Sequence, residues 1–277
     1  MIIIGERINA TRKNIAAAME RKDAEFIKNE ALRQSECGAN YIDLNAGLGK
    51  GREREDLTWL INTVQSAGDF PLCLDSSDPA VLEACLPLVK NPDRMINSIN
   101  GETKRIENLL PVIKKNADAK VIALTMDDDG IPCTAEKRVE IGISVIKLLV
   151  GGGVQEENIF VDALVQPVSV DQQNAVVYLN AVKELKRLYP KVRATCGLSN
   201  VSFGLPRRKL INQYFISVAI YAGLDSAIID PLDAPMREAI CVTEMVAGKD
   251  EYCMNYIQYA RALEASRFSA EHDVVVK

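Results

Sequence analysis

Short apolar runs rich in β-branched residues recur along this chain, and amphipathic segments separate them. Several runs are apolar at nearly every position, as expected for strands that are covered on both faces. An alternation of such strands with helical segments is typical of a parallel sheet in an α/β fold. The predicted strands lie at residues 2–4, 41–44, 71–74, 95–96, 121–124, 159–161, 194–198 and 227–229.

The amphipathic segments between these runs predict helices. Asp23 and Asp78 are suited to cap the helices that follow them, and Pro79 suits a first helical position. Gly38 and Gly223 stand where helices should end. The predicted helices cover residues 23–38, 102–113, 135–150, 172–188, 210–221, 235–247 and 251–263, with one more that begins after Asp78.

Eight strands with intervening helices in 277 residues predict a (β/α)8 TIM barrel, an α/β fold. An open, doubly wound sheet is the alternative, but the first turn, residues 5–9, is not the Gly-x-Gly-x-x-Gly of a dinucleotide site. No linker or change in composition divides the chain. We therefore expect a single domain over residues 1–277, with a surface extension from about residue 264.

The composition and net charge of the chain disfavour several classes of protein. The net charge of -5 argues against a nucleic-acid-binding protein, because such proteins usually carry a strongly basic face. No apolar run approaches the ~20 residues of a membrane span, and no signal-peptide pattern precedes the first strand. Seven scattered cysteines then predict reduced thiols in the cytoplasm. The single histidine, His272, lies in a charged tail, so a histidine-based catalytic centre is disfavoured.

Polar residues follow nearly every predicted strand at its carboxyl end. Any one of them could simply cap a helix or make a turn, and we prefer that explanation for Asp127 and Asp128. The active site of a (β/α)8 TIM barrel lies at this end of the strands. The whole set therefore predicts a ring of carboxylates and amides around one pocket. Its members are Glu6, Asn9, Asp43, Asn45, Asp75, Asn97, Asp162, Ser199, Asn200 and Asp230.

Such a ring suits a neutral, flat heterocycle with alternating donors and acceptors. A carboxylate can accept hydrogen bonds from a ring N–H and a neighbouring amino group, and an asparagine can pair with a ring carbonyl and an adjacent nitrogen. The competing hypothesis is Mg²⁺ bound by Asp43, Asp75, Asp162 and Asp230. No histidine or adjacent carboxylate pair supports a tighter metal site, so we expect no protein-bound metal.

Five blocks of the sequence, in order, resemble the pterin-binding methyltransferases. They are residues 5–9, 43–45, 73–76, 95–98 and 197–202, and the likeness extends over roughly residues 1–260. More closely, the chain resembles the methyltetrahydrofolate:corrinoid protein methyltransferases. The resemblance implies a (β/α)8 barrel that forms a homodimer and binds tetrahydrofolate at the barrel mouth. Residues 9–13 resemble the subgroup that moves methyl groups from a methylcorrinoid to tetrahydrofolate in demethylation systems.

The resemblance also assigns roles to residues. It gives the pterin edge to Asp75, Asn97 and Asp162, and it places Asn200 at N5, the nitrogen that carries the methyl group. An arginine, Arg208 or its neighbour Arg207, would meet the benzoyl-glutamate tail, although a solvated basic helix start is the plainer alternative. The remaining implied contacts with tetrahydrofolate are made by Asp43, Asn45, Gly197 and Ser199.

The chemistry of methyl transfer fits these residue types. Because a tertiary amine is a poor leaving group, N5 must gain a proton or a strong hydrogen bond as the methyl leaves. Asn200 can donate a hydrogen bond but no proton, so we predict that it stabilises the transition state. Asp43 is the first candidate for the proton source.

The corrinoid is expected on a separate protein, because the chain lacks the Asp-x-His-x-x-Gly signature of a corrinoid-carrying domain. Two alternatives to the methyltransferase stay open. One is a condensing enzyme like dihydropteroate synthase, although the loop at residues 45–50 lacks the Ser-Thr-Arg expected there. The other is a non-catalytic folate-binding protein.

Overall fold

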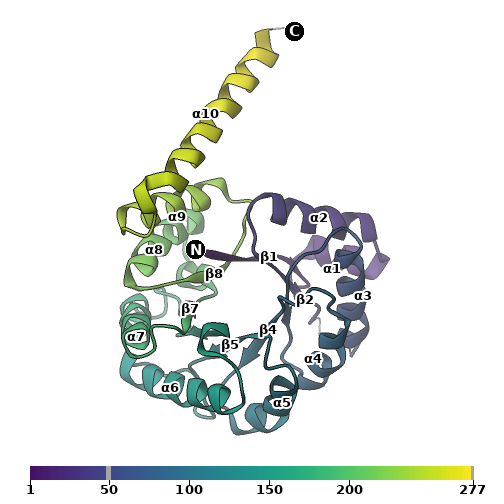
Figure 1. Cartoon of the computed structure of the whole chain (residues 1–277), viewed down its shortest axis with the longest axis vertical. Helices are drawn as coiled ribbons and strands as arrows, with labels where there is room; N and C mark the ends of the chain where they lie inside the picture. Colours follow the sequence, from purple (N-terminus) through teal and green to yellow (C-terminus); the bar gives the residue numbers. More distant parts are fainter. Residues whose placement is uncertain (48–50, 276–277) are drawn as a thin grey trace.

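The eight predicted strands form one parallel sheet that curves into a barrel, and helices surround it (Figure 1). This computed structural model describes residues 1–47 and 51–275, with side chains through Glu264. Neighbouring strands follow the order β7-β6-β5-β4-β3-β2-β1-β8. The predicted TIM barrel is confirmed. Its strands are β1 (Ile2–Asn9), β2 (Tyr41–Asn45), β3 (Leu72–Asp75), β4 (Met95–Ile99), β5 (Lys120–Leu124), β6 (Ile159–Asp162), β7 (Arg193–Thr195) and β8 (Ser226–Ile229).

Backbone hydrogen bonds between the segments of β7 and β8 close the barrel. The Ile228 amide donates to the Cys196 carbonyl at 2.8 Å, and the Asp225 amide donates to the Ala194 carbonyl at 3.0 Å. Gly197 and Ile228 form an isolated parallel bridge. The chain just after β7 is therefore fixed to β8, which places the turn that follows it at the barrel mouth.

The helices form the outer layer around the strands, as Figure 1 shows. Asp23 and Asp78 do cap their helices, by accepting from the Phe26 amide at 3.2 Å and the Ala80 amide at 2.9 Å. No helix among the described residues is both long and apolar enough to cross a membrane. The helices are α1 (Lys13–Arg21), α2 (Ala24–Glu36), α3 (Glu53–Gln65), α4 (Pro79–Cys85), α5 (Thr103–Lys115), α6 (Ala135–Gly151), α7 (Asn174–Leu188), α8 (Arg208–Ala222), α9 (Ala234–Val246) and α10 (Met254–Val275).

Three sequence predictions need correction. The strand predicted at residues 194–198 ends at Thr195, and Leu198–Ser202 forms a 3₁₀ helix, η3, in which the Ser199 carbonyl and the Ser202 hydroxyl accept from the Arg208 guanidinium. Helices α1 and α3 were not predicted. The helix predicted to end at residue 263 continues to Val275 and projects from the barrel (Figure 1). His272 and residues 48–50 lie outside the part of the chain described at side-chain level.

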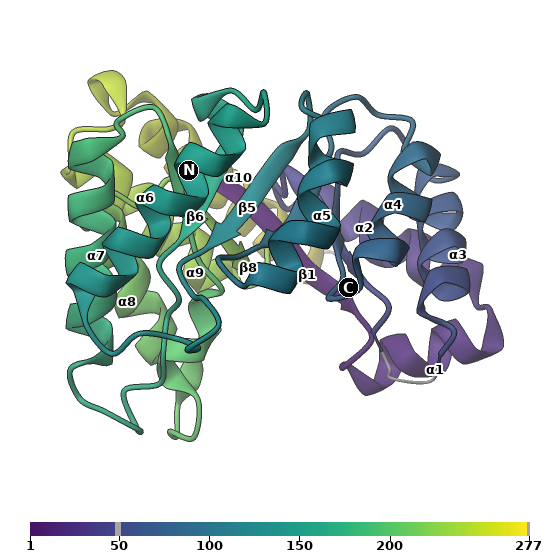
Figure 2. The same cartoon turned by 90° about the horizontal axis from the view of Figure 1, so that it is seen from below.

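The barrel interior is layered because side chains alternate along each strand. One layer is apolar and contains Phe160. The guanidinium of Arg193 lies 5.5 Å from the centre of the Phe160 ring. The residues two positions further along the strands point the same way and are mostly polar: Glu6, Asp43, Asp75, Asn97 and Asp162 stand one step above this layer. Figure 2 shows β1 running from the N-terminus toward this end of the barrel, where α1 begins. The apolar layer consists of Ile4, Tyr41, Cys73, Met95, Ile122 and Phe160.

We predict that Phe160→Ala lowers the free energy of unfolding by about 3–5 kcal/mol, because Phe160 is fully buried and its removal leaves a cavity under the polar layer. Denaturant unfolding measures the change. Val176→Ala on α7 is the control, since Val176 is 47% exposed and its truncation should cost under about 1 kcal/mol. Equal losses in the two variants would contradict the layered interior.

Candidate functional site

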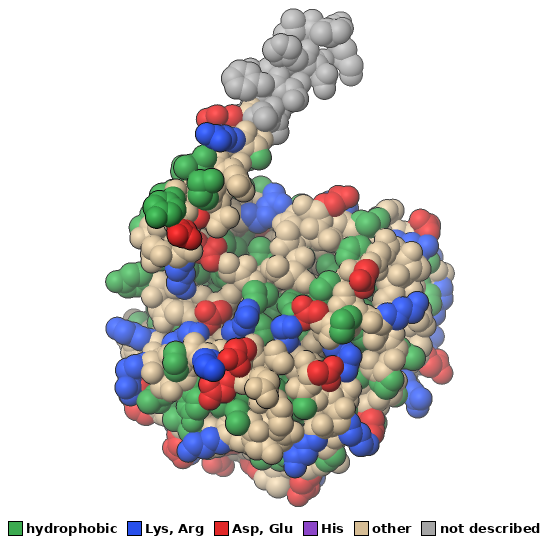
Figure 3. All heavy atoms as spheres, viewed as in Figure 1, with side chains coloured by type: hydrophobic (Ala, Val, Ile, Leu, Met, Phe, Trp, Pro, Cys, Tyr) green, Lys and Arg blue, Asp and Glu red, His purple; other side chains and the backbone are tan. Residues whose placement is uncertain are grey.

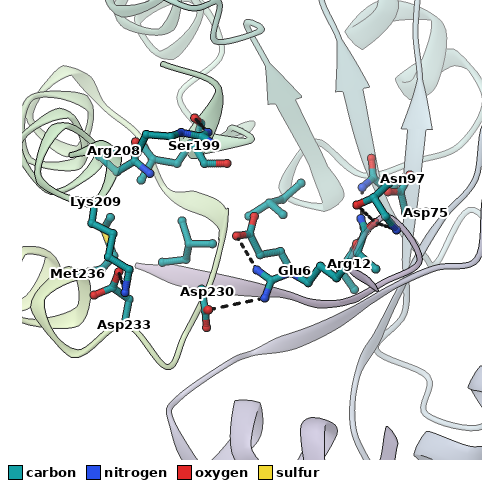
Figure 4. A pocket seen from close by; sticks show the side chains of 17 residues that line it. Glu6, Arg12, Asp75, Asn97, Ser199, Arg208, Lys209, Asp230, Asp233 and Met236 are labelled. Carbon is teal, nitrogen blue, oxygen red and sulfur yellow. Dashed lines mark hydrogen bonds and ion pairs between the residues drawn. The ribbon is translucent and has the colours of Figure 1, made fainter. Parts of the chain in front are cut away.

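A cavity of about 530 Å³ opens among the loops at the carboxyl ends of the strands. At one end it is lined by Asp43, Asp75 and Asn97, and at the other by Lys209 and Asp233 (Figure 4). Five of the residues to which the resemblance gives contacts with tetrahydrofolate line this cavity. They are Asp43, Asp75, Asn97, Ser199 and Arg208.

Two carboxyl groups and two amides are connected at one end of the cavity. The Asn45 side-chain amide donates to Asp75 at 2.8 Å, and the Asn97 amide lies 3.4 Å from Asp43. Asn45 is not among the cavity-lining residues, but its bond orients Asp75, which is. The register of the sheet explains the grouping, because Asn45 pairs with Asp75 and Asp75 with Asn97 on adjacent strands.

This grouping changes the acidity of both carboxyl groups. Burial, together with the neighbouring Asp75 carboxylate, raises the pKa of Asp43 well above its ordinary value. Burial also raises the pKa of Asp75, although the hydrogen bond from Asn45 opposes that rise. Both carboxyl groups are therefore harder to ionise than an aspartate in water.

Asp162, at the end of β6, is a second buried carboxyl group. One oxygen accepts from the Leu164 amide at 2.7 Å. Burial raises the pKa of Asp162 to about 6, while hydrogen bonds from the Leu164 and Gly197 amides and the charge of Arg138 oppose the rise. Asp162 is 6% exposed and is not among the cavity-lining residues. Its register partner Thr195 has a buried hydroxyl with no partner among the described residues.

The turn η3 (Leu198–Ser202) carries the remaining predicted residues. Ser199 lines the cavity, whereas Gly197 and Asn200 do not. A Cβ at Gly197 would lie 3.2 Å from the side-chain nitrogen of Asn200, so the glycine leaves room for this amide. The Asn200 amide thus lies against the backbone that joins β7 to β8.

Arg208, in the first turn of α8, is bound to the same turn. Its guanidinium donates to the Ser199 carbonyl at 2.6 Å and to the Ser202 hydroxyl at 3.1 Å. The Phe203 ring centre lies 5.8 Å from its central carbon. Arg208 lines the cavity, so it both holds η3 and presents positive charge to the space.

A network of charged side chains lies on the β8 side of the cavity. It joins Glu6 and Asp230 of the predicted ring to two arginines that were given no role from the sequence. Arg12 lies 3.4 Å from Glu6 and 3.9 Å from Asp230 (Figure 4), and Arg7 donates to Asp230 at 2.8 Å. Burial raises the pKa of Glu6, and the Arg12 charge opposes this rise. Arg12 lies in the segment 9–13 that carries the subgroup resemblance, but that resemblance assigned it no contact in the site.

The far end of the cavity was also missed. It is formed by the starts of α8 and α9, where Lys209 lies 3.3 Å from Asp233 and Asn212 has a buried side-chain oxygen without a partner among the described residues. Met236 supplies an apolar wall. The only available signal was the position of these residues in the first helical turns after β7 and β8.

The four candidate Mg²⁺ ligands are Asp43, Asp75, Asp162 and Asp230. In the part of the chain with described side chains, no three His, Cys, Asp or Glu residues are grouped to hold one ion. Asp230, one of the four candidate Mg²⁺ ligands, is instead bound to Arg7. The hydrogen-bonding pattern therefore favours an organic ligand with several donors.

Residues 5–230 match the family described as pterin binding enzyme, so the chain belongs to that family. A methylcorrinoid:tetrahydrofolate methyltransferase from Eubacterium limosum is 38% identical over 258 residues, which cover 92% of this chain and 94% of that protein. The methionine synthase of Mycobacterium tuberculosis is 33% identical over 242 residues, 83% of this chain but only 20% of that longer protein. The family resemblance predicted from the five sequence blocks is confirmed.

Solved structures support the fold. A dihydropteroate synthase from Xanthomonas albilineans, in complex with 7,8-dihydropteroate, superposes with a TM-score of 0.65 at 17% identity, over 88% of this chain and 93% of that one. The Yersinia pestis enzyme gives a TM-score of 0.68 at 14% identity, over 89% and 94%. At these identities the likeness concerns the barrel and not the reaction.

We predict that Asp162→Asn becomes relatively more stable than the wild type as the pH rises from about 4 to about 6. A carboxyl group whose pKa is raised on folding contributes stability that is present at low pH and lost as the pH rises through the folded-state value. Asparagine keeps an oxygen for the Leu164 amide and does not ionise. Urea midpoints at several pH values measure the difference, and a pH-independent difference would contradict the raised pKa.

Proposed function

We propose that this protein transfers a methyl group between N5 of tetrahydrofolate and the cobalt of a corrinoid carried by a separate protein. The observation that carries the proposal is the 38% identity, over nearly the full length of both chains, to a relative named methylcorrinoid:tetrahydrofolate methyltransferase. By the same likeness, the favoured direction is from the methylcorrinoid to tetrahydrofolate.

The polar end of the cavity supports a pterin as ligand. A pterin ring offers an N–H beside an amino group, and a buried carboxylate can accept from both. We assign this edge to Asp75, Asn97 and Asp162, with Asn45 holding Asp75 in place. Because each buried polar group left unpaired costs roughly 1–3 kcal/mol, this arrangement also selects against ligands without that donor pattern.

The proposed reaction balances without a further reactant. The N5 lone pair forms the new bond to the methyl carbon, and both electrons of the cobalt–carbon bond stay on the metal, which changes from Co(III) to Co(I). The nitrogen then loses its proton. Asn200, beside Gly197, stabilises the N5-protonated state through a hydrogen bond, and alignment of cobalt, carbon and nitrogen supplies much of the remaining rate.

We assign the N5 proton to Asp43. Its carboxyl group lines the cavity and lies beside Asp75, and burial together with that neighbour raises its pKa. A carboxyl group with a raised pKa binds a proton more readily than an exposed aspartate, so Asp43 can take up the proton that N5 releases. Asp43→Asn should therefore lower the transfer rate and flatten its pH dependence, whereas an unchanged profile would remove Asp43 from this role.

Two other functions make different demands on the same site. A condensing enzyme like dihydropteroate synthase would form product from a pterin pyrophosphate and p-aminobenzoate, and absence of product would exclude it. A non-catalytic folate-binding protein would bind tetrahydrofolate without any turnover. Calorimetry tests the methyltransferase and the folate-binding protein together. Both would be contradicted if neither tetrahydrofolate nor its methyl derivative bound.

We predict that Asn200→Ala lowers kcat by about a hundredfold and changes the dissociation constant of tetrahydrofolate by less than about tenfold. A hydrogen bond made chiefly in the transition state contributes to rate more than to binding. Stopped-flow rates and calorimetry on the same preparation give the two numbers. Asn108→Ala, at an exposed site on α5, is the control. Equal losses in rate and affinity would favour the binding protein.

We also propose that the protein is a homodimer joined through α8. Leu210, Tyr214, Val218 and Tyr221 lie along one side of this helix, and their exposed fractions range from 37% to 83%. Exposed apolar rows of this kind are typical of interfaces. Tyr214→Lys should shift the sedimentation coefficient from dimer to monomer, whereas Val150→Lys on α6 should not. A monomeric wild type would contradict the proposal.

A further inference from the structure

Two arginines close to the pocket make contacts that ion pairing does not explain. Arg105 and Arg138 are absent from the cavity lining, and among the described residues neither has a carboxylate within ion-pair distance. All of their described hydrogen bonds go to backbone carbonyl oxygens. Because burying a cation without a counter-charge is costly, these contacts call for a reason other than stability.

Arg138 enters from α6 and is 1% exposed. It donates to the carbonyls of Ala163 at 2.9 Å and Leu164 at 2.7 Å, directly after Asp162 on β6. It also donates to the Pro132 carbonyl at 2.8 Å. Leu164 has a φ of 61°, in the left-handed region that a leucine rarely adopts. The Leu164 amide donates to Asp162 at 2.7 Å, so Arg138 holds the residue whose amide contacts this carboxylate.

Arg105, from α5, does the same for two neighbouring strands. It donates to the Ser76 carbonyl at 2.9 Å and to the Ser98 carbonyl at 3.0 Å, and it also bonds the Ser77 carbonyl. Ser76 directly follows Asp75, and Ser98 directly follows Asn97. One guanidinium therefore ties together the ends of β3 and β4, from which two of the proposed pterin contacts project.

We propose that Arg105 and Arg138 are positioning residues of the site: each holds, through backbone carbonyls, the loop that follows a ligand-binding strand, and each supplies positive charge from behind the pocket. The proposal rests on the proposed function for the identity of the ligand, but its geometry does not. Arg208 makes the same kind of contact with the Ser199 carbonyl from within the cavity wall.

The surroundings of Asp162 show how Arg138 would act through charge. Burial raises the pKa of Asp162 to about 6, and the Leu164 amide, the Gly197 amide and Arg138 all oppose that rise. The other titratable groups that face Asp162 are Tyr178 on α7 and Cys196 after β7. Burial raises the pKa of both, so both stay neutral near pH 7. Of the three groups that oppose the rise, Arg138 is the one that carries a charge.

The first test is a titration of Asp162 by NMR in protein labelled with ¹³C at the aspartate carboxyl carbon, with Asp162→Asn used for assignment. Arg138→Met should move the Asp162 titration to higher pH by about one unit, since an opposite charge nearby typically shifts a carboxyl pKa by 1–3 units. Arg138→Lys should restore part of the shift. The control is Arg94→Met, directly before the start of β4, and it should leave the Asp162 titration unchanged. An unshifted titration in Arg138→Met would overturn the proposal.

The second test covers the case in which Arg138→Met does not fold. Arg105→Gln should lower kcat/KM for tetrahydrofolate ten- to hundredfold, because small misplacements of binding groups are amplified in the rate. The substitution should raise KM by a larger factor than it lowers the rate at saturating tetrahydrofolate. Activity equal to the wild type would overturn the role of Arg105. If the wild type fails to bind tetrahydrofolate, the proposed function falls, while the Asp162 titration still decides the role of Arg138.

Discussion

The alternation of side chains along eight parallel strands is the constraint on which this structure depends. Every second residue of a barrel strand points inward, so Ile4, Cys73 and Phe160 fill an apolar layer that excludes water. The next inward residues, Glu6, Asp75 and Asp162, are then forced into a partly buried layer directly above it. A change of one residue in strand register would turn these carboxylates toward the helices.

Burial of so many carboxyl groups in one place has an electrostatic consequence. Desolvation raises the pKa of Glu6, Asp43, Asp75 and Asp162. Amide donors and arginine side chains around them oppose that effect, each to a different degree. Three of these groups, Glu6, Asp43 and Asp75, line the cavity, which suits a ligand that offers several donors and a reaction that moves a proton.

Much of this arrangement could be predicted from the sequence. Asp75, Asn97 and Asp162 each end an apolar run, so the strand period alone places them at the barrel mouth. Helix α3 could also have been predicted, because Leu57, Leu60, Ile61 and Val64 follow helical spacing and are all buried.

The rest depends on contacts between distant segments. The turn η3 after β7 is held by hydrogen bonds from Arg208, which lies in the next helix. Arg12 joins the site because the loop after β1 returns toward β8, and Lys209 and Asp233 meet across two helix starts. No local pattern marks such residues, since their partners lie far away in the chain.

The central claim is methyl transfer between a corrinoid and tetrahydrofolate, and the most direct test follows the cobalt spectrum. Purified protein is mixed without oxygen with tetrahydrofolate and free methylcobalamin. We expect loss of the methylcobalamin spectrum, appearance of Co(I), and formation of methyltetrahydrofolate in equal amount. An unchanged spectrum, when tetrahydrofolate is bound and a corrinoid protein charged with methyl groups is supplied in place of the free cofactor, would contradict the account.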